Sequence, residues 1–402
     1  MIRPRALGYF VPAFPTQTHA FFWREVAALR AQGVEVRLFS SRRPRPEDCP
    51  HAFGDIARAE TRYVFPPRAS AVARWAARHP AGMVRALGYL RKVTGAGAKG
   101  RAKVAALLPS AADLCSAAEA AGVDHIHFHS CADAAHLGAL ARRMGGPSYS
   151  VTVHGNLDVY GTDHAAKFAD ASLVTTVTRA LRDEVLAVAP GRDVPVITMG
   201  VDTARFAGVR PTRPQGAPLR FLSISRLAPV KGHGYFLEAL RRLIDEGQNV
   251  QYVIAGSGEA EPAIRAEIAR LSLGDHVEMA GPLSQDAVRA ALGQSDVFVL
   301  TSFGHGEAAP VAVMEAMAAG LPVICSRIGG TADMIEDGVD GLLVPQQDVD
   351  AIADAARRLC ADAALRALIR KAAQRRAQSQ FDTAATARAL WEAISAARAN
   401  GA

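Results

Sequence analysis

The 402-residue chain has few cysteines and no long apolar segment. Every apolar run is shorter than the roughly 20 residues that a membrane-spanning helix needs. At the N-terminus, Arg3 and Arg5 lead into a short strand pattern instead of a secretory leader. The cysteines are odd in number and include no Cys-x-x-Cys pair, which indicates neither a disulfide framework nor a zinc site. We therefore expect a reduced, cytoplasmic protein. The cysteines are Cys49, Cys115, Cys131, Cys325 and Cys360.

Acidic residues are absent from one long stretch. Between Glu60 and Asp113 the sequence carries ten lysines and arginines but no Asp or Glu, while the whole chain has a net charge of +7. Four of these cations fall near one helical face, with apolar residues beside them: Arg74, Arg78, Arg85 and Lys92. The segment Arg62–Lys103 can therefore dock peripherally on the anionic inner face of the cell membrane. A solvated helical face is the alternative, and nucleic acid is disfavoured because no nucleic-acid module accompanies the charge.

The rest of the chain alternates between strand and helix patterns, which is typical of parallel sheets. A break rich in Pro, Gly and Arg at 206–218 separates two halves of similar size. We predict an α/β protein with two Rossmann-like, doubly wound domains, 1–205 and 219–378, that face each other across a cleft. A C-terminal helix within 379–402 is expected to return to the first domain. The predicted strands are Ala6–Val11, Val34–Phe39, Arg62–Phe65, His125–Phe128, Tyr149–Val153, Ser172–Val177, Pro195–Met199, Leu219–Ile224, Val250–Ala255, His276–Ala280, Val297–Leu300, Pro322–Cys325 and Gly341–Val344.

Two glutamates, eight positions apart, flank a predicted helix start in the second half. Proline is tolerated in a first helical turn and not in the interior, so the helix begins near Pro310. Glu307 then lies in the preceding loop and Glu315 in the second turn. The loop follows the strand Val297–Leu300, and α/β proteins bind ligands at such strand ends. Carboxylates there suit the hydroxyls of a sugar or ribose. A solvent-facing helix start explains Glu307, but less well Glu315, whose apolar neighbours require it to have a partner.

Two cations follow the first strand of the second half. Arg226 and Lys231 lie in the turn between Leu219–Ile224 and the next helix, where helix N–H groups point outward. Fixed cations beside helix N–H groups suit a diphosphate. An ordinary surface loop with two basic residues is the alternative.

Two further strand ends are candidates for a nucleotide pocket. Gly256 and Gly258 follow one strand, and a Gly-x-Gly turn lets the backbone approach a ligand closely. The third glycine of a dinucleotide fingerprint is absent, because position 261 is Glu261. Leu283 follows the next strand, where it can line a base-binding pocket or belong to a simple turn.

Histidines gather near strand ends in the first half. His154 follows one predicted strand and precedes a glycine. His125, His127 and His129 alternate along another strand, so they share a face. Metal binding is one interpretation, but no carboxylate or cysteine is grouped with them, and we predict no metal site. His129, at the carboxyl end of its strand, is the one expected to reach the cleft.

An Asp-x-Asp sequence at Asp348 to Asp350 is similar to a motif that holds a divalent metal and a nucleotide diphosphate in one class of sugar transferases. Here it directly precedes a predicted helix, 351–359, where Asp is a preferred N-cap. We therefore predict helix capping at this position.

Together these motifs resemble the retaining nucleotide-sugar glycosyltransferases of family four, which have the GT-B fold. The paired glutamates, Ser225-Arg226 with Lys231-Gly232, the glycine turn and Met199–Asp202 match in order and spacing, and the resemblance covers essentially the whole chain. The segment Phe14–Glu25 and the histidine strand look like the exopolysaccharide and colanic-acid-type branch of that family.

The resemblance implies how a donor would be bound. Arg226 and Lys231 would neutralise its diphosphate, together with backbone amides near Pro310 and Val311. Gly256, Gly258 and Leu283 would belong to the nucleotide pocket.

It also implies contacts with the sugars. Glu315 would accept the ribose hydroxyls and Glu307 those of the transferred sugar. The family usually has Glu-Gly-Phe-Gly or Glu-Gly-x-Pro here, whereas this chain has Glu307-Ala308-Ala309-Pro310, and alanine in place of glycine would narrow the sugar pocket. His154 would lie beside the donor sugar, and the cleft opposite the donor would be lined by Thr16, Gln17, Thr18 and His129.

The implied activity is transfer of a hexosyl or related group from a nucleotide-diphosphate sugar to a saccharide acceptor, lipid-linked, with retention and with neither a metal nor another cofactor. The setting would be exopolysaccharide or cell-surface polysaccharide synthesis. A nucleotide-sugar epimerase and a non-catalytic sugar-nucleotide-binding protein are the alternatives. The predicted catalytic residues are Glu307, His154, Arg226 and Lys231.

Overall fold

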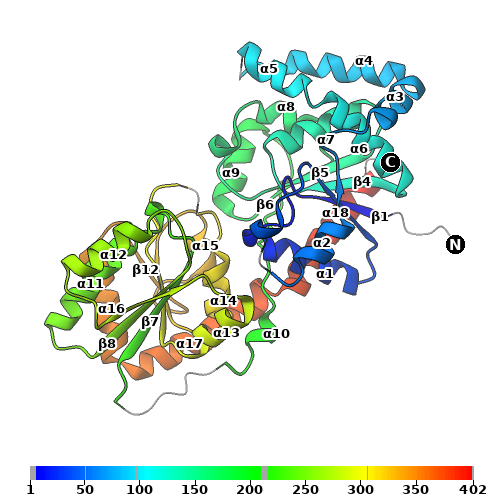
Figure 1. The fold of residues 1–402 in the computed structure, drawn as a ribbon. Coiled ribbons are helices and arrows are strands. Elements are labelled where there is room, and N and C mark those ends of the chain that lie inside the picture. Colours follow the sequence, from blue (N-terminus) through cyan, green and yellow to red (C-terminus); the bar gives the residue numbers. More distant parts are fainter. Residues whose placement is uncertain (1–5, 50, 96, 210–215, 306, 401–402) are drawn as a thin grey trace. The chain divides into compact units, whose positions relative to one another are not determined.

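The chain folds into two compact units, each built on one six-stranded parallel sheet (Figure 1). The first unit comprises Met1–Thr198 and Ala384–Ala402, and the second comprises Met199–Thr383. Two doubly wound, Rossmann-like α/β units confirm the predicted fold class. The computed structural model describes residues 6–49, 51–95, 97–209, 216–305 and 307–400.

The first sheet has the strand order β3-β2-β1-β4-β5-β6. Its central strand β1 is buried at every residue, as expected for a parallel strand covered by helices on both faces. Helices α1 and α18 pack with β1 in one hydrophobic cluster, and α6 and α7 cover the other face (Figure 1). The strands are β1 Ala6–Phe10, β2 Val36–Ser40, β3 Arg62–Tyr63, β4 Val123–Phe128, β5 Ser148–Val153 and β6 Leu173–Thr176; the helices are α1 Ala20–Ala31, α2 Gly54–Glu60, α6 Leu108–Ala120, α7 Asp133–Arg143, α8 His164–Ala169, α9 Arg179–Val188 and α18 Thr383–Asn400, with 3₁₀ turns η1 Gln17–His19, η2 Pro46–Asp48 and η4 Leu157–Tyr160.

An extra helical layer covers the outside of this unit. It is formed by α3 (Ala69–Arg78), α4 (Pro80–Tyr89), the 3₁₀ turn η3 (Leu90–Lys92) and α5 (Gly97–Ala105). Helix α3 packs on α6 and α4 packs on α7, so the layer is separated from the sheet by other helices (Figure 1). These elements contain most of the stretch that lacks acidic residues.

The second sheet has the strand order β12-β11-β10-β7-β8-β9, which is again the doubly wound pattern. Its core combines Phe221 and Tyr252 of the sheet with Phe236 and Leu240 of α11. The strands are β7 Leu219–Ile224, β8 Val250–Ala255, β9 Val277–Gly281, β10 Val297–Leu300, β11 Val323–Ser326 and β12 Leu342–Val344; the helices are α10 Thr203–Phe206, α11 His233–Asp245, α12 Glu261–Arg270, α13 Gln285–Gly293, α14 Val311–Ala319, α15 Thr331–Met334, α16 Val349–Ala361 and α17 Ala363–Gln380, with the 3₁₀ turn η5 Pro229–Lys231.

The division between the units lies earlier in the chain than the predicted boundary after residue 205. The chain passes between the units twice, and the two crossings pair with each other: Val201 N donates to Phe381 O at 2.7 Å and Thr383 N donates to Val201 O at 3.0 Å. Residues 199–205 therefore belong to the second unit. Of the predicted linker 206–218, residues 210–215 lie outside the described part of the chain.

The C-terminal helix α18 belongs to the first unit. Ala387, Leu390 and Ile394 are buried in the same cluster as Leu7 and Val26. An apolar stripe at this spacing needs a partner surface, and the face of the first sheet that carries α1 provides it.

One predicted strand is wrong and one predicted cap is confirmed. The segment Pro195–Met199 forms a single bridge, between Val196 and Thr176, because Pro195 has no N–H with which to continue a ladder. At α16, Asp348 Oδ1 accepts a hydrogen bond from Ala351 N at 2.9 Å, so it is the N-cap.

Within the described ranges, none of the helices combines the length and the apolar character that crossing a membrane requires.

Candidate functional site

The carboxyl ends of β7 and β10 are neighbours at the centre of the second sheet. From these two strands the sheet continues in opposite directions, and doubly wound sheets bind ligands at such a switch point. The loop after β7 carries Arg226 and Lys231, and the loop after β10 carries Glu307. The topology thus brings charged residues from separate sequence motifs to one end of the sheet.

Gly232 fixes these two loops against each other. Its φ is +67°, and a Cβ at this position would lie 2.1 Å from the carbonyl oxygen of Thr301. Thr301 Oγ1 donates to Gly232 O at 2.9 Å, and Phe303 N donates to Val230 O at 2.9 Å. The loop that carries Lys231 is thereby held against the end of β10.

Lys231 and Glu307 form an ion pair between Nζ and Oε2. Their side chains are only 18% and 12% exposed, and Ser302 Oγ donates to the same carboxylate oxygen at 2.9 Å. Mutual attraction and the added hydrogen bond offset part of the desolvation of both charges. The predicted diphosphate cation and the predicted sugar-binding carboxylate are therefore partners of each other in this structure. Sequence reasoning did not anticipate this pairing or single out Ser302.

Arg226 is an exposed cation on the loop after β7. Its carbonyl accepts hydrogen bonds from Ala228 N at 2.9 Å and Ser225 Oγ at 3.2 Å, which hold the backbone. In the described part of the chain no carboxylate pairs with its guanidinium. A planar guanidinium that faces solvent suits bidentate binding of a phosphate.

The helix after β10 begins where the proline predicts. Pro310 is the N-cap of α14, and Glu315 lies partly buried in the second turn. The first N–H groups of a helix, here those of Val311 and Ala312, have no acceptor within it and carry partial positive charge. This helix start is therefore suited to an anion.

A glycine pair after β11 supports the Glu307 loop. Gly329 has φ +52°, and a Cβ there would lie 1.8 Å from Glu307 O. Gly330 N donates to Ala308 O at 2.7 Å. Ala308 and its neighbour Ala309 are 8% and 6% exposed, so protein atoms cover most of their surface. Sequence reasoning missed this pair, although two adjacent glycines shortly after a strand were a usable signal.

The glycine turn after β8 packs against the loop after β7. Gly256 has φ +140° and Gly258 has φ +154°; a Cβ would lie 1.8 Å from Ser225 O in the first case and 2.3 Å from Leu227 O in the second. The close approach of the chain to itself is therefore enough to require both glycines. Their part in a nucleotide pocket, with the half-buried Leu283, stays a prediction.

In the first unit, β1, β4 and β5 are adjacent, and predicted residues follow each of them. His129 follows β4 and His154 follows β5, and the structure brings them together: His129 Nδ1 lies 3.1 Å from His154 Nε2. Thr16 is the N-cap of η1, which contains Gln17 and Thr18, and both of these are exposed.

The other two histidines of β4 are structural. His125 and His127 are fully buried, and their ring nitrogens pair with hydroxyls of β5 at 2.7–2.8 Å. Burial lowers the pKa of His125 to about 3 and the pKa of His127 well below its usual value. Neutral rings with hydroxyl partners account for the alternating pattern. The hydroxyls belong to Ser148, Ser150 and Thr152.

Glu184 of α9 holds the loop after His154, and sequence reasoning missed it. Its Oε1 accepts from Asn156 Nδ2 at 2.6 Å and its Oε2 accepts from Leu157 N at 2.9 Å. A glutamate on an amphipathic helix gives no signal in the sequence that it reaches a loop 28 residues away.

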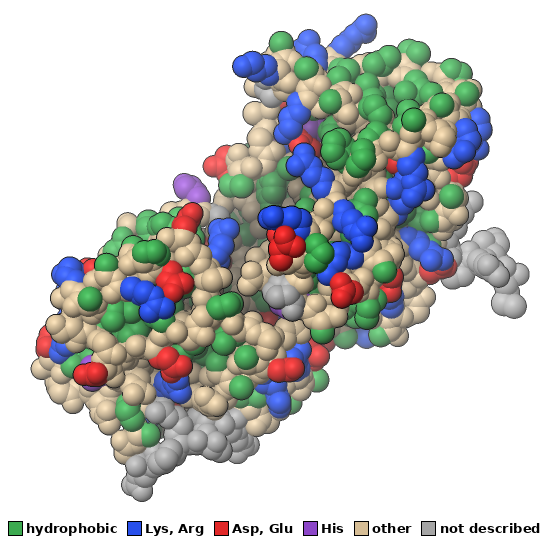
Figure 2. Space-filling view, viewed as in Figure 1, with side chains coloured by type: hydrophobic (Ala, Val, Ile, Leu, Met, Phe, Trp, Pro, Cys, Tyr) green, Lys and Arg blue, Asp and Glu red, His purple; other side chains and the backbone are tan. Residues whose placement is uncertain are grey.

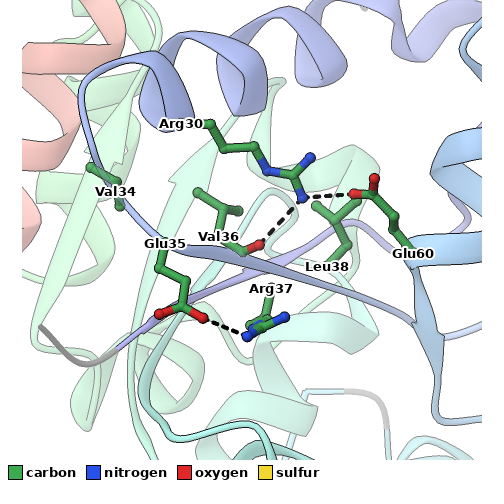
Figure 3. A pocket seen from close by; sticks show the side chains of 7 residues that line it. All are labelled: Arg30, Val34, Glu35, Val36, Arg37, Leu38 and Glu60. Carbon is green, nitrogen blue, oxygen red and sulfur yellow. Dashed lines mark hydrogen bonds and ion pairs between the residues drawn. The ribbon is translucent and has the colours of Figure 1, made fainter. Parts of the chain in front are cut away.

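A separate pocket of about 440 Å³ lies at the amino end of β2 (Figure 3). Arg30 Nη2 donates to Glu60 Oε2 at 2.7 Å and to Val36 O at 3.3 Å, and Arg37 pairs with Glu35. The polar groups that line it already have one another as partners. It lies at the edge of the sheet opposite the strand ends discussed above, and we assign it no ligand.

The fold is that of the GT-B class. The structure of Anabaena HepE in complex with UDP matches with a TM-score of 0.70 at 17% identity, covering 98% of this chain and 100% of that chain. Sucrose-phosphate synthase from Thermosynechococcus elongatus matches with a TM-score of 0.73 at 18% identity, covering 99% and 100%. At these identities the likeness establishes the fold.

Within this class the chain belongs to glycosyltransferase family four, as its sequence motifs predict. Residues 20–205 match the family described as Glycosyltransferase Family 4, and residues 210–376 match Glycosyl transferases group 1. The two matches together span both units.

Two curated relatives come from bacterial exopolysaccharide synthesis. The amylovoran biosynthesis glycosyltransferase AmsK of Erwinia amylovora is 32% identical over 59% of this chain and 60% of its own length. The putative colanic acid biosynthesis glycosyltransferase WcaL of Escherichia coli is 39% identical over 41% of each chain. The chain thus matches less than two thirds of the length of either relative.

We expect Gly232→Ala to destabilise the second unit by at least about 1–2 kcal/mol, because alanine is strained at this positive φ and its Cβ would meet Thr301 O. Hydrogen exchange of the amides of Val230, Lys231 and Phe303 measures the loss. The matched control is Gly234→Ala two residues on, inside α11, where a Cβ meets nothing within 4 Å. It should be neutral or stabilising by roughly 0.5–1 kcal/mol. Equal protection in both variants would contradict the role of Gly232.

Proposed function

We propose that the chain transfers a glycosyl group from a nucleotide-diphosphate sugar to a saccharide acceptor in exopolysaccharide or cell-surface polysaccharide synthesis. The observation that carries this proposal is the Lys231–Glu307 pair at the switch point of the second sheet, with Arg226 exposed on the same loop. The two loops after β7 and β10 thus provide two cations that can bind phosphates and one carboxylate that can accept hydrogen bonds from hydroxyls.

The donor diphosphate competes with Glu307 for Lys231. The ammonium group exchanges a carboxylate for a more highly charged phosphate, and Arg226 adds a second, bidentate cation. The N–H groups of Val311 and its neighbour, after Pro310, extend the anion site. Three sources of positive potential thus surround the leaving group.

Release from Lys231 frees Glu307 to accept hydrogen bonds from hydroxyls of the transferred sugar. Ser302 keeps the carboxylate in place during this exchange, because it bonds the same oxygen at 2.9 Å. Glu315 accepts the ribose hydroxyls from the second turn of α14. Ala308 stands where the family usually has the smaller glycine, and with Ala309 it restricts which donor sugar fits.

Glycosyl transfer from a nucleotide sugar depends on stabilising the departing diphosphate more than on a nucleophile supplied by the protein. Negative charge grows on the diphosphate as the glycosidic bond breaks, and fixed cations and helix dipoles stabilise it. Arg226 and Lys231 supply this charge from the protein, so we propose catalysis without a metal or another cofactor. We propose retention of configuration, with the departing phosphate accepting the proton of the acceptor hydroxyl.

We assign the acceptor side to the first unit. We propose that His154 would contact the donor sugar and that Thr16, Gln17, Thr18 and His129 would contact the acceptor. The proposed pathway rests on AmsK and WcaL, which are named for amylovoran and colanic acid biosynthesis. The HepE structures with UDP and UDP-glucose support a nucleotide sugar as the donor class.

A lipid-linked acceptor would require the chain to work at a membrane surface. On α4, Val84 is 68% exposed and Leu87 is 52% exposed, and Arg91 and Lys92 follow on the next turn. Lysine and arginine side chains gather at the outer edge formed by α4 and α5 (Figure 2). Exposed apolar side chains beside cations suit an anionic bilayer. We therefore propose peripheral binding to the inner face of the cell membrane through Arg62–Lys103.

The transfer activity is tested by a screen of nucleotide sugars. A donor that raises the melting temperature by mass action should be turned over by the wild-type chain, and Arg226→Ala or Lys231→Ala should each remove about 2–4 kcal/mol of transition-state stabilisation, a roughly 30- to 1,000-fold fall in kcat/KM. The matched control is Arg265→Ala, an exposed arginine of the same unit paired with Glu261.

Each contrary outcome has a meaning. Near-normal turnover in both variants would overturn the diphosphate assignment. Release of a free epimerised sugar would point to an epimerase, and donor binding without turnover to a silent binding protein.

Glu307→Gln should separate binding from transfer. The neutral amide no longer competes for Lys231, so the affinity for the nucleoside diphosphate alone should rise about three- to tenfold, or roughly 0.7–1.4 kcal/mol. Transfer should fall, because the hydroxyl acceptor is weakened. Isothermal titration measures the first effect. Glu278→Gln, which removes a surface partner of Arg220, is the control. Weaker diphosphate binding by Glu307→Gln would contradict the proposed exchange of partners.

Membrane binding is tested by charge reversal at Arg74, Arg85 and Arg91. At about 1 kcal/mol for each cation near an anionic surface, binding to phosphatidylglycerol vesicles should weaken at least about 100-fold. Arg78 is left unchanged because it already pairs with Glu119 at 2.6 Å.

The control reverses three exposed cations elsewhere, Lys371, Arg375 and Arg388, so the net charge changes equally. Cosedimentation measures both variants. If both variants lose vesicle binding equally, the effect comes from net charge alone and not from the surface of α3–α5. If neither variant loses binding, α3–α5 is a solvated surface and the proposal is wrong.

A further inference from the structure

A line of buried polar groups runs through the first unit from β1 to the end of β5. Tyr9 OH donates to Glu25 Oε1 at 2.7 Å. His129 Nε2 lies 3.3 Å from the same glutamate oxygen. At the other side of its ring, His129 Nδ1 lies 3.1 Å from His154 Nε2. The order of groups is therefore Tyr9, Glu25, His129 and His154.

Aromatic side chains fix these rings. The ring centroids of Tyr9 and His129 are 4.2 Å apart, and Phe22 lies 4.8 Å from His129 and 5.4 Å from His154. Tyr9, Phe22 and His129 are at most 5% exposed. Burial among these rings favours hydrogen bonds between the polar atoms of the line over bonds to water.

The two ends of the imidazole pair differ. His129 Nε2 is buried and makes no hydrogen bond among the described residues, but the Glu25 carboxylate lies 3.3 Å from it. His154 Nδ1 is buried and has no hydrogen-bond partner in the described part of the chain. The line thus has a carboxylate at one end and a free ring nitrogen at the other.

A neutral imidazole has one N–H donor and one acceptor nitrogen, so each contact in the line determines the next. When Glu25 is ionised, His129 donates to it from Nε2, accepts at Nδ1 from the Nε2–H of His154, and leaves His154 Nδ1 as an acceptor. When Glu25 is protonated, it donates to His129 Nε2, His129 donates from Nδ1, and His154 carries its proton on Nδ1.

We propose that Glu25 and His129 are positioning residues that set the tautomer of His154, so that its free Nδ1 switches between acceptor and donor with the protonation of Glu25. One proton separates the two states. It enters at His154 Nδ1 while the Nε2 proton of His154 passes to His129 Nδ1 and the Nε2 proton of His129 passes to Glu25. No imidazolium forms.

The charges around the line favour this arrangement. Burial raises the pKa of Glu25 to about 7, which the hydrogen bond from Tyr9 partly opposes. Burial lowers the pKa of His154 to about 3 and that of His129 well below its usual value. A proton taken up near neutral pH therefore resides on the carboxyl group. The other titratable groups that face the line are His19 of η1 and His127 of β4, and burial lowers the pKa of each.

The consequence for catalysis rests on the proposed function. If His154 lies beside the donor sugar, its Nδ1 would accept a hydroxyl proton in one state and donate a hydrogen bond in the other. Turnover would then depend on the protonation of a glutamate that does not touch the substrate. The tautomer switch itself is a property of the protein without substrate, so it can be measured separately.

The test is ¹⁵N NMR of the histidine side chains in the full chain, from roughly pH 5.5 to 8.5. In the wild-type chain, the proton of His154 should move from Nδ1 to Nε2 with a midpoint near pH 7. In Glu25→Gln, whose neutral side chain cannot titrate, His154 should keep one tautomer across the range. Glu60→Gln, at the surface partner of Arg30, should behave as wild type.

Two further variants keep the test decisive if Glu25→Gln fails to fold. Tyr9→Phe removes a donor to the carboxylate, so the midpoint should move to higher pH. His129→Phe keeps an aromatic ring and cuts the line, so His154 should no longer respond near pH 7. An unchanged midpoint in these variants, or a wild-type His154 that keeps one tautomer throughout, would overturn the proposal.

The activity measurement separates this inference from the proposed function. In the wild-type chain, kcat should change with an inflection near pH 7 that is lost in Glu25→Gln, while the KM for the donor stays within about twofold. If no nucleotide sugar is turned over, the proposed function fails and the NMR result still decides the tautomer switch. If transfer occurs and Glu25→Gln retains the inflection, the coupling to turnover fails alone.

Discussion

The close contact between Gly232 and the carbonyl oxygen of Thr301 is the constraint on which the candidate site depends. A parallel sheet places the ends of β7 and β10 side by side, but it does not by itself bring their loops into contact. The missing side chain at Gly232 allows this contact, and the hydrogen bonds around it hold the loop of Lys231 in place. From the other side, Gly329 approaches the backbone of Glu307 in the same way. Two glycines with positive φ thus position one ion pair.

In that ion pair each charged side chain is the partner of the other. Lys231 and Glu307 are both largely buried, and neither charge would be stable there alone. A ligand that carries both phosphates and hydroxyls can satisfy both groups at once, whereas a ligand with only one of these would leave the other group without its partner. On the proposed function, this coupling would favour a sugar nucleotide over a simple phosphate, and the exposed Arg226 would provide the initial attraction for the anion.

The two units place different chemistry at equivalent strand ends. Around its switch point the second sheet carries charged groups that are partly exposed. The first carries neutral histidines among aromatic rings, and burial lowers the pKa values of His129 and His154. The same doubly wound topology can therefore present charged groups suited to an anion in one unit and neutral hydrogen-bonding side chains in the other. The loops after the strands determine which chemistry each unit has.

The sequence alone determined the fold class, most strands, the start of α14 at Pro310 and the cap at Asp348, because these follow from local periodicity and from the backbone limits of proline and aspartate. It also identified Arg226, Lys231, Glu307 and His154 as candidates. Only the tertiary structure decided that Lys231 and Glu307 form an ion pair and that Glu25 lies against His129. It also showed that Gly256 and Gly258 are needed because another loop of the same chain passes too close for a side chain. These contacts join residues far apart in the chain, and their geometry depends on how loops from neighbouring strands pack, which no local pattern in the sequence records.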